Sequence, residues 1–293
     1  MDPGRLNSKA SLGTRRQTLF VVSSLGIAAL VTLASTLGLL ASWPYREETE
    51  NWVLQARGQD IGNLVAVVVL VVSAIRMVAG SSRAAQLWTG TLLYILYAYI
   101  VYAFAVHFSR LFLIYVAVLG LVFYTLLAAL PMRGDPSANR RGPARLFGAW
   151  VLIGTGALFA LLWLSELIPA TVTGQAPQSL EVAGLIVNPI HVIDLAVVLP
   201  GMITIGVLAL RGNETGRTLA VPALVFSVLM GSSIIAAMAL ILATGDTSAL
   251  VPMGMVGAVV AASLAAVIAN TRPIHEAPPH AAEAEHRTSG KEA

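Results

Sequence analysis

The sequence predicts an all-α integral membrane protein with eight transmembrane helices. Apolar residues make up 57% of the 293 residues and charged residues 11%, and a soluble fold of this size could not shield so much apolar surface from water. The basic residues are also unevenly placed, because nearly all sixteen arginines lie between long apolar runs. Together these observations indicate helices that cross a bilayer, with arginines in the connections between them.

Eight apolar segments are long enough to span, because a spanning helix needs about 20 mostly apolar residues and lipid offers no partner for a free backbone amide. Residues 1–17 and 271–293 are expected to be cytoplasmic tails, the second disordered because it has little apolar content. A cleaved signal sequence over residues 1–42 is an alternative, since it too has a basic start and an apolar run. The predicted spans are residues 18–42, 61–79, 84–106, 111–131, 147–168, 189–210, 219–243 and 249–270.

The basic residues orient these spans, because lysine and arginine are retained on the cytoplasmic side of a membrane. With the N-terminus inside, only Arg46, Arg57 and Arg110 fall outside, and the other fifteen basic residues fall inside. The sequence therefore predicts a plasma-membrane protein with both termini in the cytoplasm and the lipid bilayer as its surroundings. The net charge of +3 reflects this sidedness and does not indicate nucleic-acid binding.

The spans divide four and four at the linker from Met132 to Arg145, which combines glycine and proline with four arginines. Each half has a first helix, a long outer loop (43–60 or 169–188), a helix with a polar start, a short inner turn and a hairpin with a short outer turn. This plan fits a parallel repeat, since an inverted repeat needs an odd number of spans in each half. The alternative is the symmetry that any eight-helix protein shows by chance.

The loop 43–60 carries acidic residues and then an apolar cluster from Trp52 to Leu54. This order fits a short helix lying in the membrane interface and equally a hydrated loop. Asp60 follows at the predicted start of the second span, where a carboxylate caps free amides and meets the favourable end of the helix dipole. We therefore expect a structural role for Asp60 ahead of a binding role.

Polar residues gather at the predicted outer ends of the helices, whereas the deeper parts of the spans carry almost no ionisable group. Because an ionised group in hydrocarbon costs several kcal/mol unless it is paired, we expect these residues to converge in one pocket that opens outward. They are Gln59, Asp60, Asn63, His107, Arg110, Glu166, Asn188, His191 and Asp194.

Arg110 and Glu166 each break a local rule. Glu166 lies in the last turn of its predicted helix and Arg110 in the first turn of its own, so each meets the dipole end of its own sign. Arg110 also violates the positive-inside bias. An ion pair would remove both anomalies, and we expect Arg110 to lie near Glu166, or else near Asp194. Such a pair could serve function or simply lock helices together.

The start of the sixth span carries the most specific pattern. Asn188 suits the N-cap and Pro189 the first helical position, which puts His191 and Asp194 on one face, with Asp194 about 9 Å below the helix start. Pro200 is expected to bend this helix and leave a carbonyl of the preceding turn without its donor. A polar start with a broken middle is typical of transporter sites. In the alternative, Asp194 accepts from His191 or a neighbouring tyrosine and only fixes packing.

The third span contains four tyrosines. At 100° per residue Tyr99 and Tyr102 share one face and Tyr94 and Tyr97 another, so at least one pair is predicted to face the interior. Buried phenols need hydrogen-bond partners. The tyrosines either line an amphipathic pocket or tie helices together.

Several activities are excluded by the residue inventory. The chain has no cysteine, which excludes disulfides, thiolate nucleophiles and iron–sulfur ligation. Retinal needs a lysine inside a helix, but Lys9 and Lys291 both lie in the predicted tails, and no phosphate-binding glycine-rich loop or HExxH motif is present. A metal site built from His107, His191, Asp194 and Glu166 is chemically permissible, but scattered ligands are a weak signal. Haem between His107 and His191 would require both rings to face one cavity. We expect no cofactor and no metal.

The preferred function is binding and passage of a small solute, with proton coupling through His191 and Asp194 and with Arg110 and Glu166 as gate or counter-ion. The first alternative is a non-transporting sensor, binding protein or partner subunit. The second is an intramembrane enzyme acting on a lipid-linked substrate, since histidine and carboxylates can do acid–base work. We expect a protein that is not an enzyme. Substrate and oligomeric state do not follow from the sequence.

Overall fold

The computed structural model describes residues 3–130 and 142–271, with side chains from Arg16 onward. The C-terminal tail and most of the linker from Met132 to Arg145 lie outside these described residues. Helices and short connections make up the described part, and no strand occurs in it. The elements are α1 (Pro3–Leu40), α2 (Glu50–Val78), α3 (Ser82–Ala105), α4 (Phe112–Ala129), α5 (Pro143–Thr173), α6 (Gln178–Ala183), α7 (Pro189–Ile193), the π-helix η2 (Asp194–Val198), α8 (Leu199–Leu210), α9 (Glu214–Ala243), the 3₁₀-helix η3 (Thr247–Ala249) and α10 (Leu250–Thr271).

Eight helical segments of the described chain are long and apolar enough to cross a membrane. This confirms the predicted number of spans and indicates a multi-pass membrane protein. The bounds agree with the prediction within five residues at every end except the start of the second span. The helix α1 already begins at Pro3, inside the predicted N-terminal tail.

The second span was predicted wrongly at its start. The helix α2 begins at Glu50, where the Thr49 side chain accepts from the Trp52 amide and caps the helix, so the loop is much shorter than 43–60. The polar residues before Asp60 continue the helix because they have partners. Trp52 donates from its indole to the Ala105 carbonyl at 2.8 Å, and Gln55 donates to Asn51 at 2.6 Å. Asp60 therefore lies about 15 Å along α2 at 1.5 Å per residue and caps nothing.

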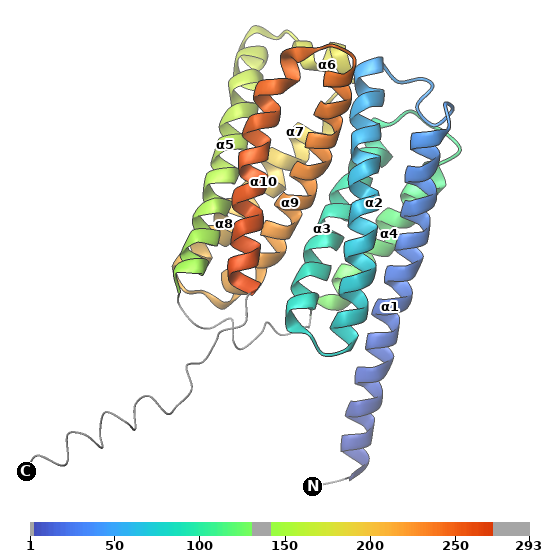
Figure 1. Cartoon of the computed structure of the whole chain (residues 1–293), viewed down its shortest axis with the longest axis vertical. Coiled ribbons are helices and arrows are strands. Elements are labelled where there is room, and N and C mark those ends of the chain that lie inside the picture. The colour runs from blue at the N-terminus through green and yellow to red at the C-terminus, as the bar shows by residue number, and fades with distance from the viewer. Residues whose placement is uncertain (1–2, 131–141, 272–293) are drawn as a thin grey trace, which may run out of the picture.

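The second predicted outer loop, residues 169–188, is also partly helical. The helix α5 continues through Pro169 to Thr173 and ends at Gly174, whose φ of 70° suits glycine at a helix C-cap. The short helix α6 then lies at the top of the molecule (Figure 1).

The helices form two groups of four (Figure 1). In the first group α1 packs on α2, α2 on α3, α3 on α4, and α4 back on α1. In the second group α5 packs on α8, α8 on α9, α9 on α10, and α10 back on α5. Each group thus closes a ring in chain order, and the connections are short enough to make consecutive helices antiparallel neighbours.

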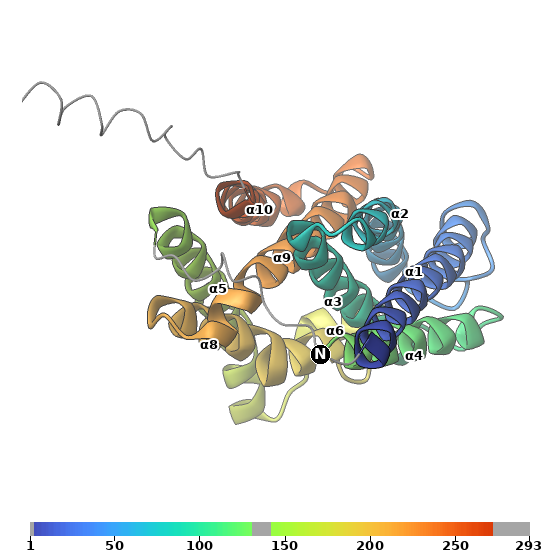
Figure 2. The ribbon, with the colours of Figure 1, turned by 90° about the horizontal axis from the view of Figure 1, so that it is seen from below.

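The helix α9 joins the two groups, because it packs against α2 and α3 as well as against its own group (Figure 2). Small residues allow this close approach. A Cβ on Gly58 would overlap the backbone of Ala237, and a Cβ on Gly62 would overlap Ser233. On α3, a Cβ on Gly90 would come within 2.5 Å of the Pro222 carbonyl oxygen. The contact between the groups is therefore tight along α9.

Both described chain ends lie at the bottom of Figure 1, which we call the lower end, and the connections 41–49, 106–111, 174–188 and 244–246 lie at the upper end. Six arginines with described side chains are at the lower end and three at the upper end, in the arrangement that the sequence predicts. Those at the lower end are Arg16, Arg76, Arg83, Arg145, Arg211 and Arg217, and those at the upper end are Arg46, Arg57 and Arg110.

Candidate functional site

A cavity of about 340 Å³ lies between the two helix groups, in the upper part of the bundle. It extends from Trp52 in the first turn of α2 to Met202 on α8, and residues of α3, α5, α9 and α10 complete its wall. Most of the lining residues are apolar. Volume and lining both match those of small-molecule sites, which are concave, mostly apolar and equipped with few polar groups.

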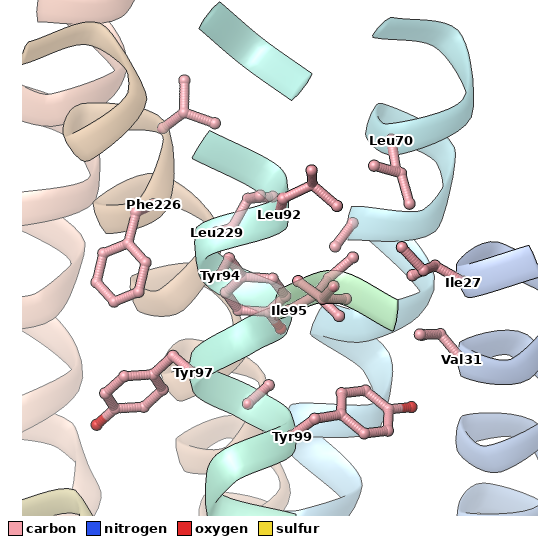
Figure 3. Packing of buried hydrophobic residues seen from close by; sticks show 14 of the residues in the cluster. Ile27, Val31, Leu70, Leu92, Tyr94, Ile95, Tyr97, Tyr99, Phe226 and Leu229 are labelled. Carbon is pink, nitrogen blue, oxygen red and sulfur yellow. The ribbon is translucent and has the colours of Figure 1, made fainter. Parts of the chain in front are cut away.

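Asp194 is the one residue with a charged side chain in the described lining of this cavity. It is buried, and its two oxygens accept from the Tyr97 hydroxyl at 2.9 Å and from the Trp163 indole N–H at 2.8 Å. Figure 3 shows Tyr97 on the side of α3 that faces Phe226, whereas Tyr99 points to the opposite side, toward α1. The contact expected if Asp194 only fixes packing, a tyrosine that donates to it, is therefore present. The Asp194 carboxylate also borders the cavity.

The local fold around Asp194 follows the sequence pattern closely. The Asn188 side chain accepts from the Ile190 amide as N-cap, and Pro189 occupies the first turn, as predicted. The break predicted from Pro200 occurs as the π-helix Asp194–Val198, in which the Leu199 amide donates to the Asp194 carbonyl. One extra residue in this turn widens the helix beside the cavity, and such π-bulges are frequent at functional sites.

His191 is buried one turn above Asp194 but does not line the cavity. Its ring packs on Trp163 with 4.6 Å between centroids, and Glu166 is the charged neighbour that acts on it electrostatically. Glu166 itself accepts a hydrogen bond from Ser179 on α6. The Trp163 indole therefore contacts both His191, through its ring, and Asp194, through its N–H.

Asp60 stands in a second cluster, on the other side of α3. It is almost fully buried, and its oxygens accept from Tyr45 at 2.7 Å and from Tyr102 at 2.8 Å. Burial, reinforced by the Asp60 carboxylate, raises the pKa of the Tyr45 phenol well above its usual range, so Tyr45 remains a donor. Arg57, one turn away on α2, interacts electrostatically with Asp60.

The cluster around Asp60 is filled by tyrosine rings. Tyr99 and Tyr102 lie 5.4 Å apart between ring centroids, which confirms that they share a face, and Tyr115 stacks on Tyr102 at 5.1 Å. The hydroxyls of Tyr99 and Tyr115 are buried and form no hydrogen bond. Tyr94 and Tyr97, predicted to share the other face, are both buried but bind different partners.

Asn63 belongs to a third set of contacts, between α1, α2, α3 and α9. It donates to Ser35 at 3.3 Å and accepts from Gln59 at 3.3 Å. Gln59 also donates to Tyr94 at 2.7 Å and accepts from Ser233 of α9 at 3.1 Å. Since Gln59 and Ser233 line the cavity, this network connects the cavity wall to Asn63.

The predicted pairing of Arg110 with Glu166 or Asp194 is wrong. The exposed Arg110 guanidinium stacks over Trp43, with 5.8 Å to the ring centroid, so it is stabilised by an aromatic face instead of a carboxylate. His107, also exposed, interacts with Glu48 through its backbone amide at 2.7 Å and its ring Nδ1 at 3.0 Å. Neither His107 nor Arg110 belongs to the cavity lining.

The predicted convergence of all polar residues in one recess is therefore wrong. The structure separates them into the Asp194 cavity, the Asp60 cluster and the upper-end contacts of His107 and Arg110. Among the residues that the structure describes, no three histidine or acidic side chains lie close enough together to hold a metal ion. A comparison with protein-family models, curated proteins and solved structures finds no match for this chain.

Sequence reasoning placed Gln59 among the polar residues at the outer helix ends but missed Trp163 as a site residue. The helix α5 runs on past Trp163 and places its indole N–H against the Asp194 carboxylate. The position of Trp163, 31 residues before Asp194, gives no local signal. Gln59 stood at the supposed end of a loop, and only the longer helix α2 turns it toward the cavity.

Proposed function

We propose that this protein binds a small amphiphilic solute in the cavity beside Asp194 and carries it across the membrane. The observation that supports this most directly is an open cavity in the membrane-spanning region with a single buried carboxylate on its wall. Ionisable groups at this depth are costly, and they commonly serve substrate or proton pathways. Asp194 and His191 are the groups that would exchange protons if transport is proton-coupled.

A second cavity supports passage from one side to the other. It measures about 810 Å³ and lies at the lower end, between α3, α4 and the start of α9. On α9 this lower cavity ends at Pro222, and the upper cavity begins at Phe226. Between them Gly90 of α3 packs directly against Pro222 and Val225. The α3–α9 contact would then be the barrier that opens during transport.

We infer further that the two groups of four helices are a parallel repeat. Asp60 and Asp194 both lie on the second spanning helix of their group, and an arginine at the lower end follows each by 23 positions, Arg83 and Arg217. Gly90, 30 positions after Asp60, contacts Val225, 31 positions after Asp194. Equivalent residues meet in this way at a two-fold axis along the membrane normal. In an experimental structure the two halves should superpose so that Asp60 falls on Asp194. Halves that do not superpose in this way would contradict the repeat.

The orientation that we propose has the upper end outside a plasma membrane and both termini in the cytoplasm. The support is the unequal number of arginines at the two ends, because basic residues stay on the cytoplasmic side. Single cysteines introduced at the two ends test it, since the chain contains no cysteine of its own. A membrane-impermeant maleimide should label a cysteine at position 246 in intact cells and not one at position 212.

Uptake into vesicles tests the transport proposal. Vesicles containing the protein are incubated with a defined mixture of small organic cations, anions and zwitterions at acidic, neutral and alkaline pH, and their contents are measured by mass spectrometry. At least one compound should accumulate more than in protein-free vesicles, and Asp194→Asn should remove that excess. Asp246→Asn is the matched control, because Asp246 is exposed and its capping bond to Ser248 needs only one acceptor oxygen. Equal contents in all vesicles at every pH would refute transport.

A non-transporting binding protein is the second candidate. The observation in its favour is the wall below Asp194, where Leu199, Met202 and Phe226 are apolar and only Thr155 and Ser227 are polar. Such a wall provides no continuous polar path. Saturable binding of a compound that never accumulates in the vesicles would favour this function over transport.

A further inference from the structure

We infer that the solute is an organic cation, with one positive charge on an apolar body. This inference rests on the proposed function and names the class of its substrate. The charges on the cavity wall support this inference. Among the described lining residues Asp194 has the one charged side chain, and no arginine, lysine or histidine contributes to the wall. The wall therefore offers a place for a positive charge and none for a negative one.

Asp194 has neutral partners only. Its two hydrogen bonds come from a phenol and an indole, which stabilise a carboxylate without neutralising its charge. The nearest imidazole, that of His191, lies against the Trp163 ring and has Glu166 as its charged neighbour. A buried carboxylate is stable when a counter-charge reaches it. A cationic ligand supplies that charge from the cavity.

The rest of the wall suits an apolar body next to that charge. Trp163 and Tyr97 bind the carboxylate, and Phe226 packs on Tyr97 with 5.6 Å between ring centroids. All three rings line the cavity, and aromatic faces attract cations within about 6 Å. Met202, Met230 and Met238 add flexible, polarisable side chains that adapt to ligands of different shape. An uncharged apolar solute would gain the burial but would leave Asp194 without a counter-charge.

The Asp60 cluster provides a comparison, because Asp60 is a buried carboxylate that does not line the cavity. Asp60 is enclosed by Tyr45 and Tyr102, and the guanidinium of Arg57 lies close enough to act on it electrostatically. A Cβ on Gly38 would overlap the Asp60 side chain, so no space remains between Asp60 and α1. One carboxylate is thus enclosed by side chains with an arginine close by, whereas the other borders a cavity that has no basic residue in its described lining.

Binding measurements on the purified protein test the charge of the ligand. The probes are phenyltrimethylammonium, its uncharged isostere tert-butylbenzene, and benzenesulfonate as an anion of similar size. Their binding to the protein in nanodiscs is measured by calorimetry, or by the displacement of one probe by another. The wild-type protein should bind the cation at least about tenfold more tightly than either other probe, which corresponds to about 1.4 kcal/mol. Asp194→Asn should remove this preference, and the control Asp246→Asn should keep it.

Two binding results would overturn the inference. One is equal or tighter binding of the uncharged isostere or the anion by the wild-type protein, a comparison that requires no variant to fold. The other is an unchanged preference for the cation in Asp194→Asn. Uptake of an anion or a zwitterion into vesicles would also contradict the cationic class while supporting transport, so the two proposals fail separately.

Discussion

Asp60 and Asp194 are two buried carboxylates on corresponding helices, but their surroundings differ. Each accepts two hydrogen bonds, one of them from a tyrosine of α3. Asp60 is packed among tyrosine rings with Arg57 nearby. Asp194 instead borders a cavity, and the described lining of that cavity contains no basic side chain. The same chemical group is therefore structural where its surroundings are complete, and open to a ligand where they are not.

The difference begins with the small residues next to each aspartate. Gly58 and Gly62 stand two positions before and two after Asp60, and they let α2 press against α9. The corresponding positions around Asp194 hold Val192 and Ala196. The helix α7 touches α3 over only a short stretch. Asp194 reaches α3 through Tyr97, and the cavity lies beside this hydrogen bond. Helix packing thus closes one site and leaves the other open.

The largest effect is expected from filling the close contact of α2 with α9. In Gly58→Val the new side chain meets the Ala237 backbone, which cannot move aside, so we expect a loss of stability at or above the usual overpacking range of about 1–3 kcal/mol. Gly257→Val is the control, because a Cβ at Gly257 meets nothing within 4 Å. Thermal unfolding in detergent measures both. Equal unfolding temperatures for the two variants would show that the α2–α9 contact is loose.

Removing each carboxylate compares the two sites directly. In Asp60→Ala two enclosed tyrosine hydroxyls lose their acceptor, and each buried donor without a partner costs about 1–3 kcal/mol. In Asp194→Ala the Tyr97 hydroxyl can turn to water in the cavity, so we expect a smaller fall in unfolding temperature and a larger loss of cation binding. If Asp194→Ala is the less stable variant, the assignment of the two roles is reversed.

A smaller effect is expected from the α3 tyrosines. Tyr102→Phe removes one bond to Asp60, and Tyr97→Phe removes one bond to Asp194. Hydrogen bonds to charged groups contribute about 1.5–3 kcal/mol, less than removal of the whole carboxylate. Tyr102→Phe should lower the unfolding temperature with binding retained, whereas Tyr97→Phe should mainly weaken phenyltrimethylammonium binding. The Tyr102 ring also lines the cavity, and phenylalanine keeps that ring while removing the hydroxyl. Loss of binding in Tyr102→Phe alone would show that the ligand depends on the Tyr102 hydroxyl and its bond to Asp60.

The smallest effect is expected at Arg110. Its contact with Trp43 is an exposed cation–π interaction, worth about 0.5–1 kcal/mol. Arg110→Gln should therefore shift the unfolding temperature little and leave vesicle uptake unchanged. A loss of uptake as large as that of Asp194→Asn would show that Arg110 takes part in transport, although the structure places it away from the cavity.

The helices were predictable because membrane spans have a strong signal in composition. Their number followed from apolar runs and arginine positions, and Asn188 and Pro189 marked the start of α7 correctly. The start of α2 could not be found in this way, because residues 50–60 include many polar and charged side chains and are held in the helix by partners distant in the sequence. The indole bond from Trp52 to Ala105 is one such contact.

The site was predictable only in part, for a related reason. His191 and Asp194 stood out because they lie three residues apart at a helix start. The partners of Asp194 come from α3 and α5, and those of Asp60 from α3 and the loop before α2, so only the folded chain brings them together. The rule that opposite charges pair misled the interpretation of Arg110 and Glu166, because an aromatic ring and a serine hydroxyl satisfy them instead.

The π-helix Asp194–Val198 also places Asp194 just above a point where the helix holds one surplus residue. If that turn tightened to α geometry, the segment above it would rotate by about 100° about its axis, the angle between neighbouring residues. Such a rotation would swing the carboxylate away from Tyr97 and Trp163 without moving α8. Faster amide hydrogen exchange at Leu195–Val198 during turnover than at rest would reveal a ratchet of this kind.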